Sequence, residues 1–167
     1  MTPIEWLEAH APGFKELQAT EREAIAEFSL LWSLFEANVL GNRASSKAIC
    51  DVAQTWKGRL DAEAFEPHLE YFRQRYFQKG SPTKHFNGQY GLNLRNSDQP
   101  QLVEGVLVGT IDDGPRVIAA LLVIVYRLRN NLFHGMKWAF GLADQFENFR
   151  NANQLLMLSL EVHLYLK

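Results

Sequence analysis

The sequence predicts an all-α fold, a bundle of about five to six helices that forms a single domain over residues 1–167. Apolar residues recur three and four positions apart along much of the chain, which is the spacing of one helix face. Hydrophobic residues make up 47% of the chain and charged residues 22%, a composition typical of a folded globular protein. No segment requires a β-ladder.

The first helix is expected over residues 20–40, after an irregular start that Pro12-Gly13 interrupts. Gly41-Asn42 ends this helix, and a second one opens near Ser45-Ser46 and reaches about residue 57. The apolar residues of the first helix follow the helical spacing: Ile25, Phe28, Leu31, Trp32, Phe35 and Val39.

A third helix is expected after Asp61, which suits the N-cap position, and ends at Gly80-Ser81-Pro82. Residues 80–100 are rich in Gly, Pro, Asn and Ser, and therefore predict a long loop of the kind that is often functional or mobile. The apolar segment 102–111 follows, and its valines leave helix and strand both open.

The core helix is expected over residues 115–134, with Asp112-Asp113-Gly114-Pro115 as its start and Gly135 as its stop. Its apolar run VIAALLVIVY, residues 117–126, has about half of the ~20 residues needed to cross a bilayer, so it predicts a buried helix and no membrane span. A last helix is expected over residues 144–166, with these residues facing inward: Phe146, Phe149, Leu155, Leu156 and Leu160.

A cytoplasmic protein is expected from the cysteine count and the N-terminus. Cys50 is the single cysteine, so the chain can form no internal disulfide. The first ten residues, MTPIEWLEAH, carry acids where a signal peptide has a basic start and an apolar run.

The charge is unevenly distributed along the chain. The net charge of −2 argues against a strongly basic nucleic-acid binder. However, residues 71–97 and 114–143 contain no Asp or Glu and hold nine of the seventeen Lys and Arg residues, so a polarised surface could attract a polyanion. The long loop mixes basic and aromatic residues that could stack on RNA, although an ordinary surface loop is favoured: Lys84, His85, Phe86, Tyr90 and Arg95.

Common catalytic templates do not occur in this sequence. It has no phosphate-binding loop, no Gly-x-Ser-x-Gly elbow and no His-Glu-x-x-His. The five histidines lack metal-ligand spacing, so neither a metal nor another cofactor is expected. Gly105 and Gly109, four residues apart, are interpreted as sites of close helix packing.

The polar end of the core helix is unusual. The segment RLRNNLFHGMK, residues 127–137, places arginines, amides, an imidazole and a lysine where an apolar helix emerges, and buried polar groups need partners. Asn130 and His134 are one turn apart and share a face. Arg129 lies about 140° around an ideal helix from His134, so either its side chain curls back or the site is shared with a second copy.

This segment resembles the signature of HEPN domains, which are all-α domains with an Arg, four to six residues and then a His. Arg129, Asn130 and His134 match that pattern, with Asn130 as the polar residue after the Arg. The match covers residues 117–137, and residues 28–40, FSLLWSLFEANVL, are similar to the first core helix of one branch of the superfamily.

The resemblance implies a dimer in which two motifs meet and cut RNA without a metal. Imidazole exchanges protons near neutral pH, and a guanidinium can stabilise a phosphorane-like transition state. The expected catalytic residues are therefore Arg129, Asn130 and His134, and the expected substrate-binding residues are Arg127, Asn131 and Lys137. The alternative is structural: Arg127 and Lys137 as solvated charges or charges that complement the helix dipole, and His134 as a hydrogen-bonding group at the helix end.

The leading prediction is a metal-independent HEPN endoribonuclease in which the RNA 2′-hydroxyl attacks the adjacent phosphate, in a toxin or phage-defence setting with RNA and an antitoxin or other protein as partners. The alternative is a non-catalytic HEPN dimerisation module that binds a nucleotide, RNA or a protein. Some HEPN toxins carry a Tyr, which a partner enzyme modifies, at the position of Met136, so that control is not expected here. Glu36 could pair with Arg129, although a solvated Glu36 is favoured.

Overall fold

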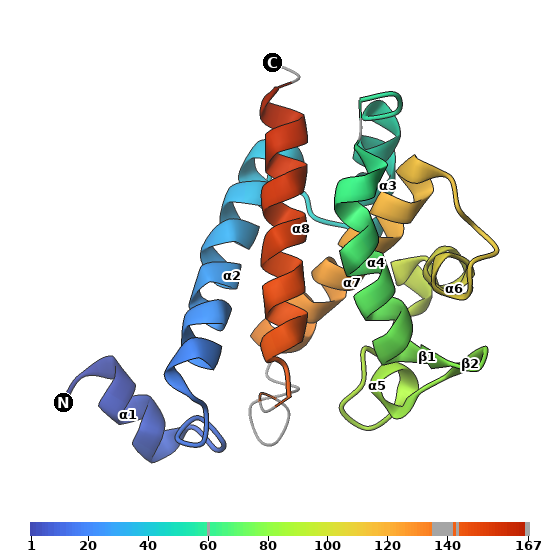
Figure 1. The fold of residues 1–167 in the computed structure, drawn as a ribbon. Coiled ribbons are helices and arrows are strands. Elements are labelled where there is room, and N and C mark those ends of the chain that lie inside the picture. The colour runs from blue at the N-terminus through green and yellow to red at the C-terminus, as the bar shows by residue number, and fades with distance from the viewer. Residues whose placement is uncertain (60, 135–141, 143, 166–167) are drawn as a thin grey trace.

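Three long helices organise the molecule. Helices α2 (Ala19–Val39) and α8 (Phe146–Leu164) lie side by side, and α7 (Gly114–Phe133) crosses behind α8 (Figure 1). This computed structural model describes residues 1–59, 61–134, 142 and 144–165. Within that part of the chain the fold is almost wholly helical, which confirms the all-α class predicted from the sequence.

The shorter elements lie on both sides of the α2 and α8 pair (Figure 1). Helices α3, α4 and α6 stand on the side of α8 opposite α2, and the small elements of the 77–98 region lie below them (Figure 1). The bounds are α1 Pro3–His10, α3 Ser46–Thr55, α4 Ala62–Tyr76, β1 Phe77–Gln78, β2 Ser81–Pro82, α5 Lys84–Asn87, the 3₁₀-helix η1 Asn96–Asp98, and α6 Pro100–Val108.

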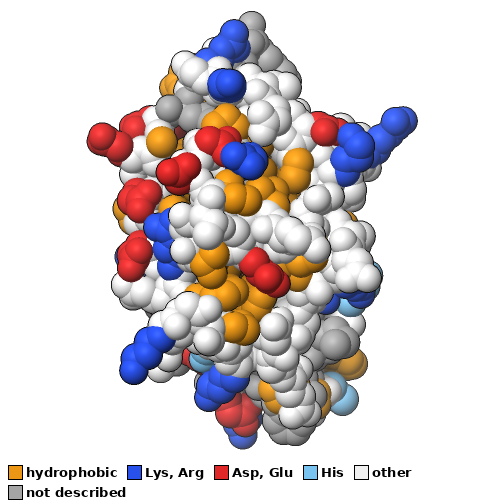
Figure 2. Space-filling model, turned by 90° about the vertical axis from the view of Figure 1, so that its right-hand side faces the viewer, with side chains coloured by type: hydrophobic (Ala, Val, Ile, Leu, Met, Phe, Trp, Pro, Cys, Tyr) orange, Lys and Arg blue, Asp and Glu red, His pale blue; other side chains and the backbone are white. Residues whose placement is uncertain are grey.

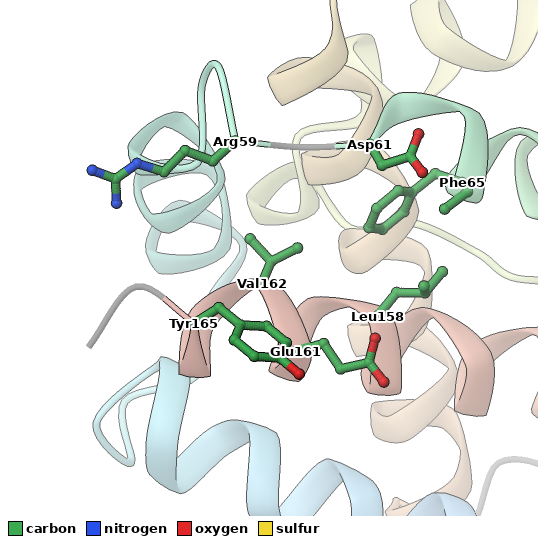
Figure 3. Close-up of a pocket in the computed structure, with 8 residues that line it drawn as sticks. Arg59, Asp61, Phe65, Leu158, Glu161, Val162 and Tyr165 are labelled. Carbon is green, nitrogen blue, oxygen red and sulfur yellow. The ribbon is translucent and has the colours of Figure 1, made fainter.

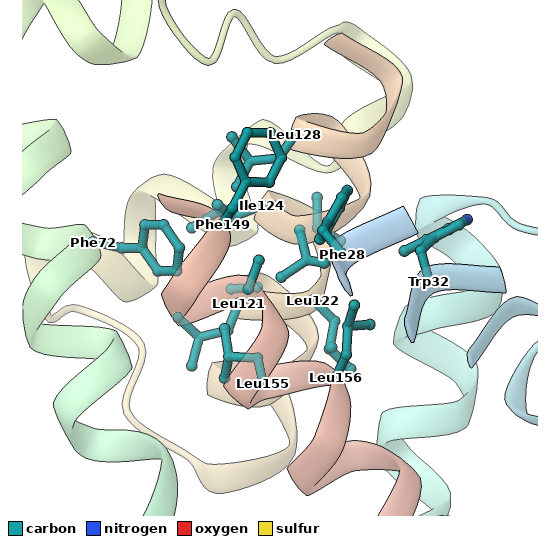
Figure 4. Close-up of a cluster of buried hydrophobic side chains, with 14 of the residues drawn as sticks. Phe28, Trp32, Phe72, Leu121, Leu122, Ile124, Leu128, Phe149, Leu155 and Leu156 are labelled. Carbon is teal, nitrogen blue, oxygen red and sulfur yellow. The ribbon is translucent and has the colours of Figure 1, made fainter. Parts of the chain in front are cut away.

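Helix α7 is the centre of the hydrophobic core. It begins at the predicted signal, because the Asp113 carboxylate accepts a hydrogen bond from the Arg116 N–H at 3.3 Å and Pro115 occupies the first turn. Every side chain from residue 118 to 125 is at most 1% exposed, which confirms the buried helix. Side chains of α2, α4 and α8 surround it in Figure 4: Phe28, Trp32, Phe72, Phe149, Leu155 and Leu156.

Capping residues explain where the other helices begin and end. The Asp61 side chain accepts from the Glu63 N–H at 3.2 Å, which confirms Asp61 as the N-cap of α4. The segment that was open between helix and strand is a helix, α6, because Pro100 stands in its first turn and Gly109 closes it at φ +85°. The close helix packing expected at Gly105 and Gly109 is not present among the described residues: a Cβ at Gly105 would lie 2.6 Å from Ile111 Cδ1, in the loop after α6, and Gly109 is the cap of α6.

Two local expectations are wrong. The irregular N-terminus contains α1, which a capping box between Thr2 and Glu5 begins. The third helix ends at Tyr76 and is followed by an antiparallel hairpin of β1 and β2, although no β-ladder was expected. The reason is the turn Lys79-Gly80, whose φ angles of +51° and +77° suit a two-residue hairpin.

Some expectations fall on residues that the structure does not describe. Gly135, Met136 and Lys137 lie outside the described residues.

The inward face of α8 is largely as predicted. Phe146 is half-buried, whereas the four other residues expected to face inward from α8 are buried. None of the described helices combines the length and the apolar character that a membrane crossing requires.

Candidate active site

The polar end of α7 has an inward side, formed by Arg127 and Asn131. Their side chains are 5% and 4% exposed. Arg127 Nε donates to the Leu92 carbonyl oxygen at 3.1 Å, and Asn131 Nδ2 donates to the same oxygen at 3.0 Å. The two residues therefore fasten the predicted long loop to α7 from within.

A buried carboxylate completes this inward cluster. Asp98 Oδ2 lies 3.8 Å from Arg127 Nε and accepts the Arg95 N–H at 2.8 Å. Burial lowers the pKa of Arg127, and the negative charge of Asp98 acts in the opposite direction. The Ser46 hydroxyl donates to the Ser97 carbonyl, so η1 is also held to the start of α3.

The outward side carries Arg129, whose guanidinium lies between α7 and α2. Arg129 Nη1 donates to Asn130 Oδ1 at 3.1 Å, and Nη2 lies 3.8 Å from Glu36 Oε2. The same Glu36 oxygen accepts from Trp32 Nε1 at 2.7 Å. The sequence favours a solvated Glu36, but in the structure Glu36 pairs with Arg129.

Aromatic rings flank the Arg129 guanidinium. Its central carbon lies 5.2 Å from the centroid of the Phe133 ring and 5.9 Å from that of Trp32. The Nε atom is buried and has no hydrogen-bond partner among the described residues. About 29% of the Arg129 side chain remains exposed, so part of this side chain can meet a ligand from solvent.

His134 stands at the C-terminal end of α7, one residue past the helix. Its backbone N–H donates to the Asn130 carbonyl at 3.0 Å, and its side chain is exposed. Within the described part of the chain its imidazole makes no hydrogen bond or ion pair. Among the described residues, the side chains of Arg129 and Asn130 are therefore joined to each other, and His134 is joined to Asn130 through the backbone.

Sequence reasoning missed several residues of this region. Phe133 lies inside the motif but was treated as a spacer, although it is 54% exposed and contacts Arg129. Trp32 and Glu36 are one turn apart on α2, and Glu36 is the only charged residue between positions 28 and 40, which was the available signal. Leu92 and Asp98 carried no signal, because their role depends on how the loop folds back.

Much of the basic charge predicted to attract a polyanion is used within the protein. Arg73 donates to the Val106 carbonyl at 3.2 Å, and Arg75 pairs with Asp144 at 3.3 Å. On the face shown in Figure 2, both basic and acidic side chains surround exposed hydrophobic atoms, and no continuous basic surface is visible among the described residues on that face. In the long loop, Phe86 is 2% exposed and belongs to the core, so it cannot stack on RNA.

A cavity of about 750 Å³ lies elsewhere, between the start of α4 and the last turns of α8. Phe65, Leu158 and Val162 project toward one another across it, and Arg59 extends away (Figure 3). It contains none of the residues predicted from the motif.

Comparisons of this chain with protein-family models, with curated proteins and with solved structures find no match. No group of three or more His, Cys, Asp or Glu side chains in the described part of the chain is placed to hold a metal ion.

Proposed function

We propose that this protein is a metal-independent endoribonuclease of the HEPN type, acting in the cytoplasm as a homodimer. The observation that carries the proposal is the pairing of Arg129 with Asn130 at 3.1 Å near the end of α7, the helix that the exposed residue His134 caps. A partly exposed arginine side chain and an exposed imidazole are the groups that phosphodiester cleavage by an internal nucleophile needs.

The proposed reaction needs no group beyond RNA and these side chains. The 2′-hydroxyl oxygen of a nucleotide forms a bond to the adjacent phosphorus, and the bond from that phosphorus to the 5′-oxygen of the next nucleotide breaks. One imidazole accepts the 2′-hydroxyl proton, and a second supplies a proton to the leaving 5′-oxygen. Arg129 stabilises the added negative charge on the phosphoryl oxygens. The products carry a 2′,3′-cyclic phosphate and a 5′-hydroxyl.

A second copy of the chain supplies the second imidazole. Arg129 is directed toward α2, and within the described part of the chain no hydrogen bond or ion pair joins it to the His134 side chain. A two-fold pair of chains would bring two copies of His134 to one phosphate. Sedimentation at micromolar concentration should therefore give a dimer, and a strict monomer would count against this arrangement.

Arg127 and Asn131 take a positioning role in this proposal. Both were expected to bind substrate, but their side chains point into the protein and hold Leu92. They would act on RNA only through the loop that they fasten. The substrate role of Lys137 stays a prediction from the sequence.

The direct test is cleavage of labelled single-stranded RNA in excess EDTA. The expected products end in a 2′,3′-cyclic phosphate, and a substrate with a 2′-deoxy nucleotide at the cleaved position should resist. His134→Ala, purified in the same way, controls for contaminating ribonuclease. A toxin or phage-defence role, with an antitoxin as partner, would then be tested by whether expression of the wild-type chain, and not of His134→Ala, arrests growth.

One observation favours the second candidate, a non-catalytic module of the same family. Arg129 already forms an ion pair with Glu36, at 3.8 Å. This carboxylate would repel a phosphate. If the protein is a module that binds a nucleotide, RNA or a protein without cutting RNA, wild type and His134→Ala should bind their ligand equally well. Neither should cleave RNA.

A further inference from the structure

An apolar groove lies beside the candidate site, between α1, α2 and the end of α7. It has a volume of about 360 Å³, near the lower end of the range for small-molecule sites. Ten described residues line it; eight of them are apolar, and the two polar ones are Arg22 and Ser29. None of these ten residues is acidic, and the carboxylates nearby are Glu8, which pairs with Arg22, and Glu36, which pairs with Arg129.

Phe133 connects this groove to Arg129. Its ring lines the groove, is 54% exposed, and has the Arg129 guanidinium carbon 5.2 Å from its centroid. A single exposed apolar ring is ordinary on a protein surface, but this ring joins an apolar groove to a guanidinium. Because the same ring contacts the proposed phosphate-binding group, a ligand on Phe133 would lie next to the phosphate.

A second arginine forms the far wall. The Arg22 guanidinium lies 4.6 Å from the centroid of the Phe14 ring and donates to the Phe14 carbonyl oxygen at 3.2 Å. Glu8 pairs with Arg22 at 2.7 Å, which holds α1 along the groove. The Ser29 hydroxyl donates to the Ile25 carbonyl at 3.0 Å and keeps its acceptor lone pairs for a ligand. The groove therefore has apolar walls with a few polar atoms at its edge.

We propose that this groove is a nucleobase subsite, which receives the base of the nucleotide whose phosphate lies against Arg129, with Phe133 as its stacking platform. This inference rests on the proposed function and names how that site would hold its substrate. A nucleobase has apolar faces and polar edges, and stacking on an aromatic side chain is the usual way proteins hold an unpaired base. A stable protein interface needs about 800 Å² from each partner, whereas this feature is a small concave groove.

The test measures the binding of short single-stranded oligonucleotides with 2′-O-methyl groups, which cannot be cut by the proposed reaction. One abasic residue is moved through the oligonucleotide, and affinity is measured by fluorescence anisotropy. For wild type, one abasic position should weaken binding by roughly 5- to 100-fold, the size of one base–aromatic stack. Phe133→Ala should bind the intact oligonucleotide more weakly than wild type by the same factor. Its affinity should not fall further when the base at that position is removed.

Matched variants separate stacking from folding. Phe133→Trp should keep the abasic penalty, because it keeps an aromatic face. Leu34→Ala, which shortens an exposed leucine of α2 that does not line the groove, should behave as wild type.

The outcomes separate this inference from the proposed function. If wild type cleaves RNA but no abasic position matters, the subsite is wrong and the endoribonuclease proposal stands. If wild type neither binds nor cleaves RNA, both fail. If Phe133→Ala keeps the wild-type abasic penalty and instead changes the mass measured by light scattering, a second chain covers the groove and the subsite is wrong.

Discussion

Arg127 and Arg129 are two residues apart on one helix, and the structure gives them opposite environments. Arg127 is 5% exposed, shares the Leu92 carbonyl with Asn131 and lies beside the buried Asp98. Arg129 faces α2, stands between two aromatic rings and leaves part of its guanidinium in solvent. Both residues come from the same polar segment, but they have different partners.

The difference shows that a polar cluster at the end of an apolar helix can have two roles at once. The inward side satisfies its hydrogen bonds inside the protein and thereby places the 80–100 segment. On the outward side, about 29% of the Arg129 side chain remains in contact with solvent. Mutations on the inward side should therefore change stability, and those on the outward side should change activity.

The largest expected effect is on stability. Arg127→Ala should lower the free energy of unfolding by about 3–5 kcal/mol, because it leaves the buried Asp98 carboxylate without its cation. Urea denaturation measures this change. The control is Arg116→Ala, whose exposed pair with Asp113 should be worth less than about 1 kcal/mol. Equal midpoints for Arg127→Ala and wild type would show that the inward cluster does not support the fold.

On the outward side, His134→Ala should reduce RNA cleavage by roughly 100-fold or more, the usual size of a general acid–base contribution. Arg129→Ala should lose a comparable factor, and Arg129→Lys should restore little, because lysine lacks the guanidinium fork. Excess EDTA should change none of these rates. Both alanine variants should have the melting temperature of wild type. The control His163→Ala, which changes another histidine near a helix end, should cleave RNA at the wild-type rate.

A loss of stability without a specific loss of cleavage in His134→Ala would remove the distinction between the two sides. It would place His134 with Arg127 as a structural residue.

The two neighbouring asparagines test the comparison at a finer scale. Asn131→Ala should cost about 1 kcal/mol of stability, because one hydrogen bond to the Leu92 carbonyl is lost while that of Arg127 remains. The amide protons of Leu92 and Asn93, bonded to His85 and Phe86 carbonyls at 2.8 Å, should exchange faster. Asn130→Ala should leave these protons unchanged and slow cleavage. The reverse pattern would contradict the assignment of the two faces.

Much of the fold could be predicted from the sequence, because its signals are local. The spacing of apolar residues predicted the long helices, and Asp61 and Asp113 marked two helix starts that the structure confirms. The N-terminal helix was missed although Thr2-Pro3 and Glu5 supply a capping box, because α1 buries no residue completely and so lacks an apolar face in the sequence.

The sequence motif predicted candidate site residues but not their environments. The motif named Arg127, Arg129, Asn130 and Asn131 without distinguishing inward from outward side chains. That distinction depends on Leu92, which folds back from 35 residues away in the sequence to meet Arg127. Spacing along a helix cannot predict a contact between residues so far apart in the sequence. Only the structure separates Arg127 and Asn131, which hold Leu92, from the candidate catalytic residues Arg129 and Asn130.

The smallest expected effect concerns Glu36, which touches Arg129 from α2. Glu36→Gln keeps an oxygen that can accept from Trp32 Nε1 but removes the charge 3.8 Å from Arg129. If Arg129 meets an RNA phosphate, that phosphate competes with Glu36, so RNA affinity should rise by about two- to five-fold, as expected when a partly exposed ion pair is released. The dependence of log affinity on log salt should steepen by up to about 0.7, because one more cation becomes available to the strand. Glu16→Gln, which makes the same charge change at an exposed position, should alter neither quantity. Weaker RNA binding by Glu36→Gln would mean that the carboxylate holds Arg129 in place for the substrate and does not compete with it.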